Sequence, residues 1–339
     1  MKRIIAASLM IVLAMLSAGC SRPVATSLPA AVDQHLEWIP RTAEGVIYVD
    51  LKSLRASALA KELEKDWGER MKPWREETDY RQFMEKAGFD IEKDLEQILV
   101  GMENGDHESM HSPTVIATGN FDEQKIISAL DALREARREK GKPVFFSAAY
   151  GGKTISVTDD SAKAFYFADA HTVVFGKKAW VQSVIDGKTA GESVKHNEEV
   201  MALLQKLPFK NQCWMIANTT KLAERLSEEL GAEGGFRGTR AMKSLQGVLF
   251  SAQVEEKAKL FGEALCDNEG NSRLLAEAAK GALATAKLAV SEDREAVDML
   301  NRIKVELKGK SVEMRTDLDS AFFNKWLEKT KHRKAVAIR

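Results

Sequence analysis

The feature that most constrains how this chain of 339 residues can fold is an internal repetition of its strands and helices. Runs rich in β-branched and aromatic residues predict strands, and apolar residues at helical spacing predict helices. The same order of two strands and a long helix occurs twice, at 94–102, 114–119 and from Asp122, and again at 244–254, 257–265 and 272–290. The sequence therefore predicts two related units that arose by duplication.

A hairpin followed by a helix closes each unit. The first hairpin lies within 164–185, with its tip at Ala170-His171, and the second lies within 303–327, with its tip at Gly309-Lys310. This alternation of hairpins and helices predicts an α+β fold, in which an antiparallel sheet of split β-α-β character is covered by helices on one face. The two units are predicted to span residues 44–210 and 211–330.

The N-terminus has the organisation of an export signal. Lys2 and Arg3 precede an apolar run, residues 4–16, that is too short to cross a bilayer as a helix, and small residues then lead to Cys20. This order is typical of a signal peptide, so residues 1–19 are excluded from the folded part. Residues 20–43 contain scattered prolines among small residues and are predicted to form a tether.

Leu16-Ser17-Ala18-Gly19-Cys20 resembles the lipobox of bacterial lipoproteins, with Ser17 where leucine is common. The resemblance implies cleavage before Cys20 and attachment of fatty acids such as palmitate to that residue. It further implies a lipid-anchored protein of the cell envelope facing the periplasm, and Ser21 favours the outer membrane under the sorting rule of lipoproteins. The alternative is an ordinary signal peptide cut near Ala18, which would leave Cys20 as a free thiol.

The balance of charges argues against a nucleic-acid-binding role, because such proteins carry a strongly basic face. The chain has 50 basic and 50 acidic residues, and removal of residues 1–19 takes away two basic ones, which leaves 48 against 50. The expected partners are the membrane, through the lipid on Cys20, and an envelope protein or cell-wall component. The basic tail at 331–339 is predicted to be a solvated terminus.

A zinc-peptidase motif, H-E-x-x-H, is formed by His107, Glu108 and His111. The motif binds zinc only on a helix, where residues four apart share a face. Here a turn signal at 104–106 precedes it, Pro113 follows it, and predicted strands flank it. We therefore predict a loop at a hairpin tip and no catalytic residues, with a weak surface metal site at His107 and His111 as the alternative.

Two further cysteines, Cys213 and Cys266, both lie in predicted strands. An even pair in an oxidising compartment allows a disulfide, but spacing alone does not fix the geometry. Two buried free thiols are therefore the preferred interpretation, and the disulfide is the alternative.

The segment IPRTAEGVIYVDLKSLRAS, residues 39–57, resembles a strand-to-helix step found in duplicated secreted and envelope proteins of bacteria. The function of that group is unknown. The resemblance therefore implies fold and compartment, and it implies no activity or cofactor.

The sequence is compatible with three functions. The preferred hypothesis is a membrane-anchored envelope lipoprotein with a non-enzymatic binding or structural role. The second is a zinc-dependent hydrolase that uses His107, Glu108 and His111. The third is a periplasmic carrier of an apolar ligand, because the helix at 272–290 is apolar around much of its circumference and either lies between two layers or walls a groove.

Overall fold

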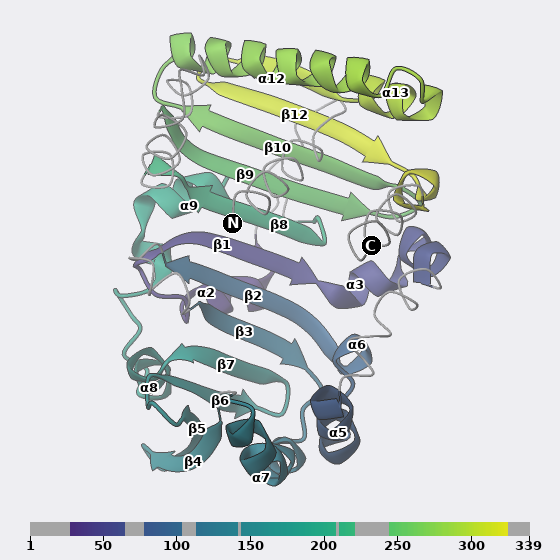
Figure 1. Ribbon diagram of the computed structural model, residues 1–339. Coiled ribbons are helices and arrows are strands. Elements are labelled where there is room, and N and C mark those ends of the chain that lie inside the picture. The colour runs from purple at the N-terminus through teal and green to yellow at the C-terminus, as the bar shows by residue number, and fades with distance from the viewer. Residues whose placement is uncertain are drawn as a thin grey trace. The chain divides into compact units, whose positions relative to one another are not determined.

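The computed structural model describes residues 28–64, 78–103, 113–141, 144–207, 210–220 and 244–324 (Figure 1). The chain forms two compact units. The N-terminal unit comprises residues 28–55 and 64–201, and the C-terminal unit comprises residues 56–63 and the chain from Ala202 onward. The predicted boundary at 210/211 therefore falls later than the boundary in the structure, and the short segment 56–63 belongs to the unit opposite to the one predicted.

The N-terminal unit contains one seven-stranded antiparallel sheet. Its elements are α2 (Ala30–Leu36), β1 (Ala43–Asp50), α3 (Leu51–Ala56), α5 (Thr78–Ala87), α6 (Ile91–Asp94), β2 (Leu95–Glu103), β3 (Thr114–Gly119), α7 (Glu123–Glu139), β4 (Phe145–Tyr150), β5 (Lys153–Thr158), β6 (Lys163–Asp169), β7 (Thr172–Lys177), α8 (Lys178–Ile185) and the 3-10 turn η2 (Val194–His196), with α9 (Glu198–Leu204) leading into the next unit. The strand order is β1-β2-β3-β7-β6-β5-β4, and neighbouring strands in this order are antiparallel.

The C-terminal unit repeats the same topology. Its elements are a helical stretch at 58–64, β8 (Cys213–Asn218), β9 (Leu245–Val254), β10 (Ala258–Cys266), α12 (Glu269–Ala289), α13 (Arg294–Asn301), β11 (Lys304–Lys308) and β12 (Ser311–Leu318). Its strand order, β8-β9-β10-β12-β11, matches β1-β2-β3-β7-β6 position by position. The predicted α+β fold with an internal duplication is therefore confirmed. Among the described residues, strands β4 and β5 have no counterpart in the C-terminal unit.

Local sequence signals set most of the element ends. The predicted cap Asp122 accepts a hydrogen bond from the Lys125 amide at 3.1 Å and starts α7, as expected for an N-cap. Gly88, which ends α5, has φ +61°, a conformation that glycine adopts at little cost. Ser53 lies within the first turn of α3, which begins at Leu51, and the Asp50 carboxylate accepts from both the amide and the hydroxyl of Ser53.

Helices α5 and α7 cover one face of the N-terminal sheet, and the turn that follows α2 packs on the other. On one face, α5 and α7 pack with Phe167 and Val173 in a cluster that includes Ala87 and Ile126. On the other face, the Ile39 side chain packs directly over Gly101 of β2. Side chains alternate along a strand, and the paired positions place Gly101 and Val173 on opposite faces.

The segment 58–64 supplies two core leucines to the C-terminal unit. Leu59 and Leu63 are buried against Ala252, Leu260 and Leu318. This apolar contact explains why a segment early in the sequence belongs to the later unit.

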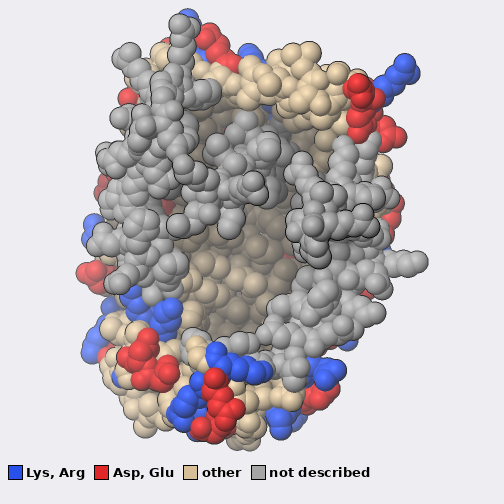
Figure 2. All heavy atoms as spheres, viewed as in Figure 1, with Lys and Arg blue, Asp and Glu red and all other residues tan. Residues whose placement is uncertain are grey.

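Helix α12 is much more exposed than its Ala-rich sequence predicts. Ser272 and Ala276 are buried, whereas the side chains of Leu274 and Leu288 are 44% and 75% exposed. Figure 2 shows uncharged surface over the middle of this helix. Burial between two layers, one of the two arrangements that the sequence leaves open, therefore does not describe this helix. Among the described residues, no helix is both long and apolar enough to cross a bilayer.

Candidate functional site

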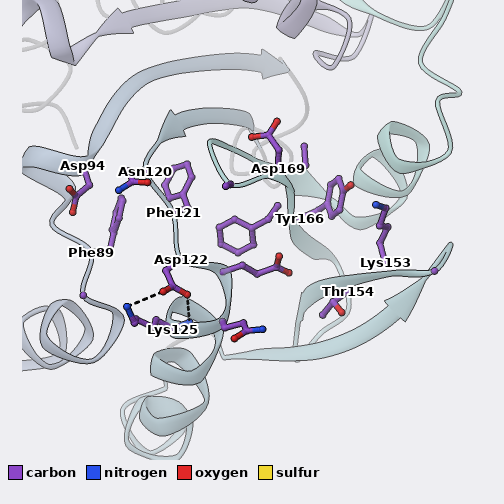
Figure 3. Close-up of a pocket in the computed structure, with 17 residues that line it drawn as sticks. Phe89, Asp94, Asn120, Phe121, Asp122, Lys125, Lys153, Thr154, Tyr166 and Asp169 are labelled. Carbon is purple, nitrogen blue, oxygen red and sulfur yellow. Dashed lines mark hydrogen bonds and ion pairs between the residues drawn. The ribbon is translucent and has the colours of Figure 1, made fainter.

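A cavity of about 810 Å³ opens in the N-terminal unit where α7 begins (Figure 3). Four separate segments line it: the end of α5 with α6 (88–94), the β3–α7 connection (120–125), the start of β5 (152–154) and the end of β6 (166–170). Because these segments come from different parts of the sequence, the cavity is a product of the tertiary fold.

The cavity exists because β5 and β6 separate. Their pairing is confined to Ser156 with Phe165 and Val157 with Ala164, although both strands continue past these pairs. The turn at Gly151 and Gly152 (φ +56° and +74°) joins β5 to β4, and β6 keeps its pairing with β7. The sheet is thus split at one end, and the split faces the N-terminus of α7.

Phenylalanine rings form the floor of the cavity. Phe89 and Phe167 are each only 8% exposed, and Phe121 lies between them. The centroid of Phe121 is 5.2 Å from that of Phe89 and 5.9 Å from that of Phe167, the second pair edge to face. These separations are typical of stabilising aromatic pairs, so the floor is a packed surface.

Carboxylates dominate the charge of the lining. Asp94, Asp122, Glu123 and Asp169 stand against Lys125 and Lys153, so four negative charges and two positive charges give a net charge of −2. The Asp122 carboxylate accepts from the amide of Lys125, which is the main cause of its lowered pKa, and forms an ion pair with the Lys125 ammonium at 3.0 Å (Figure 3). Burial, with Glu123 and Asp169 nearby, raises the pKa of Tyr166.

Backbone hydrogen bonds hold the rim in place. The hairpin tip accepts from Gly119 and Phe121, whose amides donate to His171 and Ala170 at 3.0 Å each. The Asp169 carboxylate accepts from the His171 amide at 2.7 Å, and the Asp94 carboxylate accepts from the Asp90 amide at 2.6 Å. The hairpin tip predicted at Ala170-His171 is confirmed, and it fixes one wall of the site.

Several predicted features lie outside the described residues. These are the lipid-attachment residue Cys20, the motif residues His107, Glu108 and His111, and the tail at 331–339. The strands predicted to flank the motif are confirmed, because β2 and β3 are antiparallel neighbours with Gly101 paired to Thr114. Within the described part of the chain, no three His, Cys, Asp or Glu side chains are grouped closely enough to hold a metal ion.

The possible disulfide between Cys213 and Cys266 is not formed, and both are free thiols in the structure. Cys213 pairs with Ala252 on β9, whereas Cys266 pairs with Leu245 on the same strand. These two partners are seven positions apart along β9, which is about 24 Å in an antiparallel strand. A disulfide needs Cα atoms within about 7 Å.

Both thiols are expected to react with maleimide in denaturant without any reductant, in the variant Cys20→Ala. In the native state Cys266 should be protected, since burial raises the pKa of its thiol and only the thiolate is a strong nucleophile. Intact mass after labelling measures this: two additions are expected in denaturant. A chain that takes up label only after reduction would contradict the assignment.

No known protein-family model matches the chain, and no curated protein matches it. Among solved structures, crystal forms of TP0453 are similar to it. Crystal form III gives a TM-score of 0.45 at 8% identity over 84% of this chain and 94% of TP0453. Crystal form I gives 0.41 at 8% identity over 88% of this chain and 96% of TP0453. The function of the present chain is therefore inferred from its own residues.

Proposed function

We propose that the chain is a lipid-anchored protein of the bacterial envelope that binds another envelope component without catalysis, through the acidic cavity of its N-terminal unit. The observation that carries the proposal is the export signal ending in the lipobox-like residues Leu16 to Cys20. The cavity supplies the place of binding, because it combines an apolar floor with a few positioned charges, as ligand sites generally do.

The state of Asp122 supports binding over proton transfer. Its carboxylate accepts a hydrogen bond from the backbone amide of Lys125, which lowers its pKa and favours the ionised form. Fixed negative charges raise the local concentration of cations near the cavity. A general acid would instead need a carboxyl group whose pKa is raised toward neutral pH.

The charged rim also favours this proposal over a carrier of apolar ligands. An apolar ligand would desolvate the rim carboxylates without forming hydrogen bonds to them, and such desolvation is unfavourable in free energy. A ligand with a positive group avoids that cost. The zinc-hydrolase hypothesis stays a prediction, because its three residues lie outside the described part of the chain.

Replacing Cys20 with alanine is expected to release the protein from the membrane fraction of a Gram-negative host. Each buried methylene contributes about 0.8 kcal/mol, so two or more acyl chains hold a protein stably where none would. Metabolic labelling with an alkyne fatty acid, followed by fractionation, measures the effect. The variant Cys213→Ala is the matched control and should keep both label and membrane association. An unlabelled wild-type protein in the soluble fraction would refute the anchor.

A further inference from the structure

We infer that the occupant of the cavity is an extended peptide with a basic side chain, which inserts between β5 and β6. This inference rests on the proposed function, since it takes the cavity as the binding site. It goes further by naming the chemistry of the partner, and three independent features of the lining support it.

The first feature is a pair of strand edges, one on β5 and one on β6, that pair with no other described strand. In a two-residue hairpin the closing pair, here Tyr150 and Lys153, is hydrogen-bonded, so the N–H and C=O groups of Lys153 point toward β4. These groups alternate in direction from one residue to the next, so those of Thr154 point away from β4, toward β6. On β6, Phe165 pairs with β5, and by the same alternation the backbone groups of Phe167 point toward β5. Both residues line the cavity, beyond the end of the β5–β6 pairing. Their N–H and C=O groups match the main chain of an added strand.

The second feature is the sign of the charge. The lining carries a net charge of −2, with Asp94 at one wall and Asp169 at the other (Figure 3). Opposite charge across an interface steers a partner toward it and excludes partners of like charge. A lysine or arginine side chain is the complement that a peptide can supply.

The third feature is the composition of the floor and the far wall. Phe89, Phe121 and Phe167 offer faces on which an alkyl stem or a cation can rest. Tyr166 is only 8% exposed and lines the same cavity, and its hydroxyl makes no hydrogen bond to any other described residue. The hydroxyl is not closed off from solvent, so it is available for a hydrogen bond with a ligand in the cavity.

The test uses the full exported chain with Cys20→Ala and a fluorescein-labelled Val-Lys-Val-Lys-Val amide, followed by fluorescence anisotropy. Saturable binding is expected, weakening as salt is added because the attraction is screened. Methylation of two alternate peptide nitrogens, which removes strand donors and keeps both charges, should weaken binding about ten-fold or more. The peptide Val-Glu-Val-Glu-Val should not bind.

Two protein variants locate the site. The double variant Asp94→Asn with Asp169→Asn keeps an oxygen that can accept from Asp90 and His171, so the rim should persist while the net charge rises to zero. It should weaken the lysine peptide about ten-fold or more. The control Asp131→Asn removes a carboxylate of α7 that lies outside the cavity and pairs with Arg134, and it should leave binding unchanged.

Each outcome separates this inference from the proposed function. If methylated and unmethylated peptides and spermidine all bind through Asp94 and Asp169 alike, the cavity is a simple cation site, and the peptide inference falls while the proposed function stands. If the double variant binds the peptide as the parent does, the cavity is not the site, and both the inference and the proposed binding site fall. The lipid anchor is tested separately, by the fractionation of wild type and Cys20→Ala. A failure there does not affect the peptide-binding result.

Discussion

Replacing Glu313 with alanine is expected to lower the free energy of unfolding by about 3 kcal/mol, the low end of the range for breaking a buried ion pair. Glu313 lies on β12, is 4% exposed, and accepts from the side chains of Lys308 at 2.7 Å and Arg315 at 2.6 Å. Arg315 also stacks over the ring of Phe261, so it cannot turn freely to water when its partner is lost. Urea denaturation of the Cys20→Ala chain measures the change.

Glu306→Gln provides the matched control. Glu306 pairs with Glu313 across the strands and lies 3.7 Å from the same Lys308, but its side chain is half exposed. An exposed pair of this kind contributes about 0–1 kcal/mol. If Glu313→Ala cost no more than Glu306→Gln, burial of the cluster would not be what stabilises the unit.

The pH dependence of the same comparison has a definite sign. Burial alone would raise the pKa of Glu313, but hydrogen bonds from Lys308 and Arg315 outweigh it, and the pKa lies below its ordinary value of 4.5. A carboxylate with a lowered pKa in the folded state stabilises the fold at any pH above the unfolded value. The stability difference between wild type and Glu313→Ala should therefore be constant above pH 4.5 and shrink as the pH falls through the lowered pKa.

Replacing Gly119 with alanine is expected to lower the free energy of unfolding by about 1–3 kcal/mol, because the added methyl group overpacks a closed contact. A Cβ atom at Gly119 would lie 2.4 Å from the backbone oxygen of Asp94, and backbone atoms cannot swing aside as a flexible side chain can. Relief requires the end of β3 to move, and the cavity segment that begins at Asn120 must move with it. Peptide binding should therefore weaken together with stability.

Gly281→Ala adds the same methyl group in the middle of α12 and serves as the control. Apart from its own helix, no atom of the residues that the structure describes lies within 4 Å of a Cβ built at Gly281. In a helix interior alanine is favoured over glycine by about 0.5–1 kcal/mol, so this variant should gain stability. Thermal or urea unfolding compares the two, and effects of the same sign would contradict the contact assigned to Gly119.

The sequence predicts the elements of the fold well wherever a local signal marks them. Asp122, Gly88 and the turn at Gly309-Lys310 each end or begin an element for a reason that acts within a few residues. Strand β4 escaped prediction because it is an edge strand with several exposed residues, so it lacks the alternation of a half-buried strand. Helix α13 escaped because it is short.

The cavity could not be predicted from the sequence, because no local signal marks it. Asp94 and Asp169 line the same cavity only because β3 pairs with β7. The strand that follows β3 in the sequence is β4, and it lies at the other end of the strand order. Phe89, Phe121 and Phe167 each resemble an ordinary core residue when considered alone. The sequence also does not predict that the pairing of β5 with β6 stops at Ser156. Lys153 and Thr154 have the residue types of an ordinary strand, so nothing in them marks the end of the pairing.

The placement of residues 58–64 has a consequence for the order of biosynthesis. Leu63 leaves the ribosome about 190 residues before Ala252, the β9 residue of its core cluster, which at typical elongation rates is a delay of roughly 10–40 s. During that interval a nascent chain holds two leucines for which the N-terminal half offers no place in its own core. Splitting the gene between Met201 and Ala202 would therefore yield two incomplete products, one with an unburied amphipathic helix and one with a vacancy in its interior.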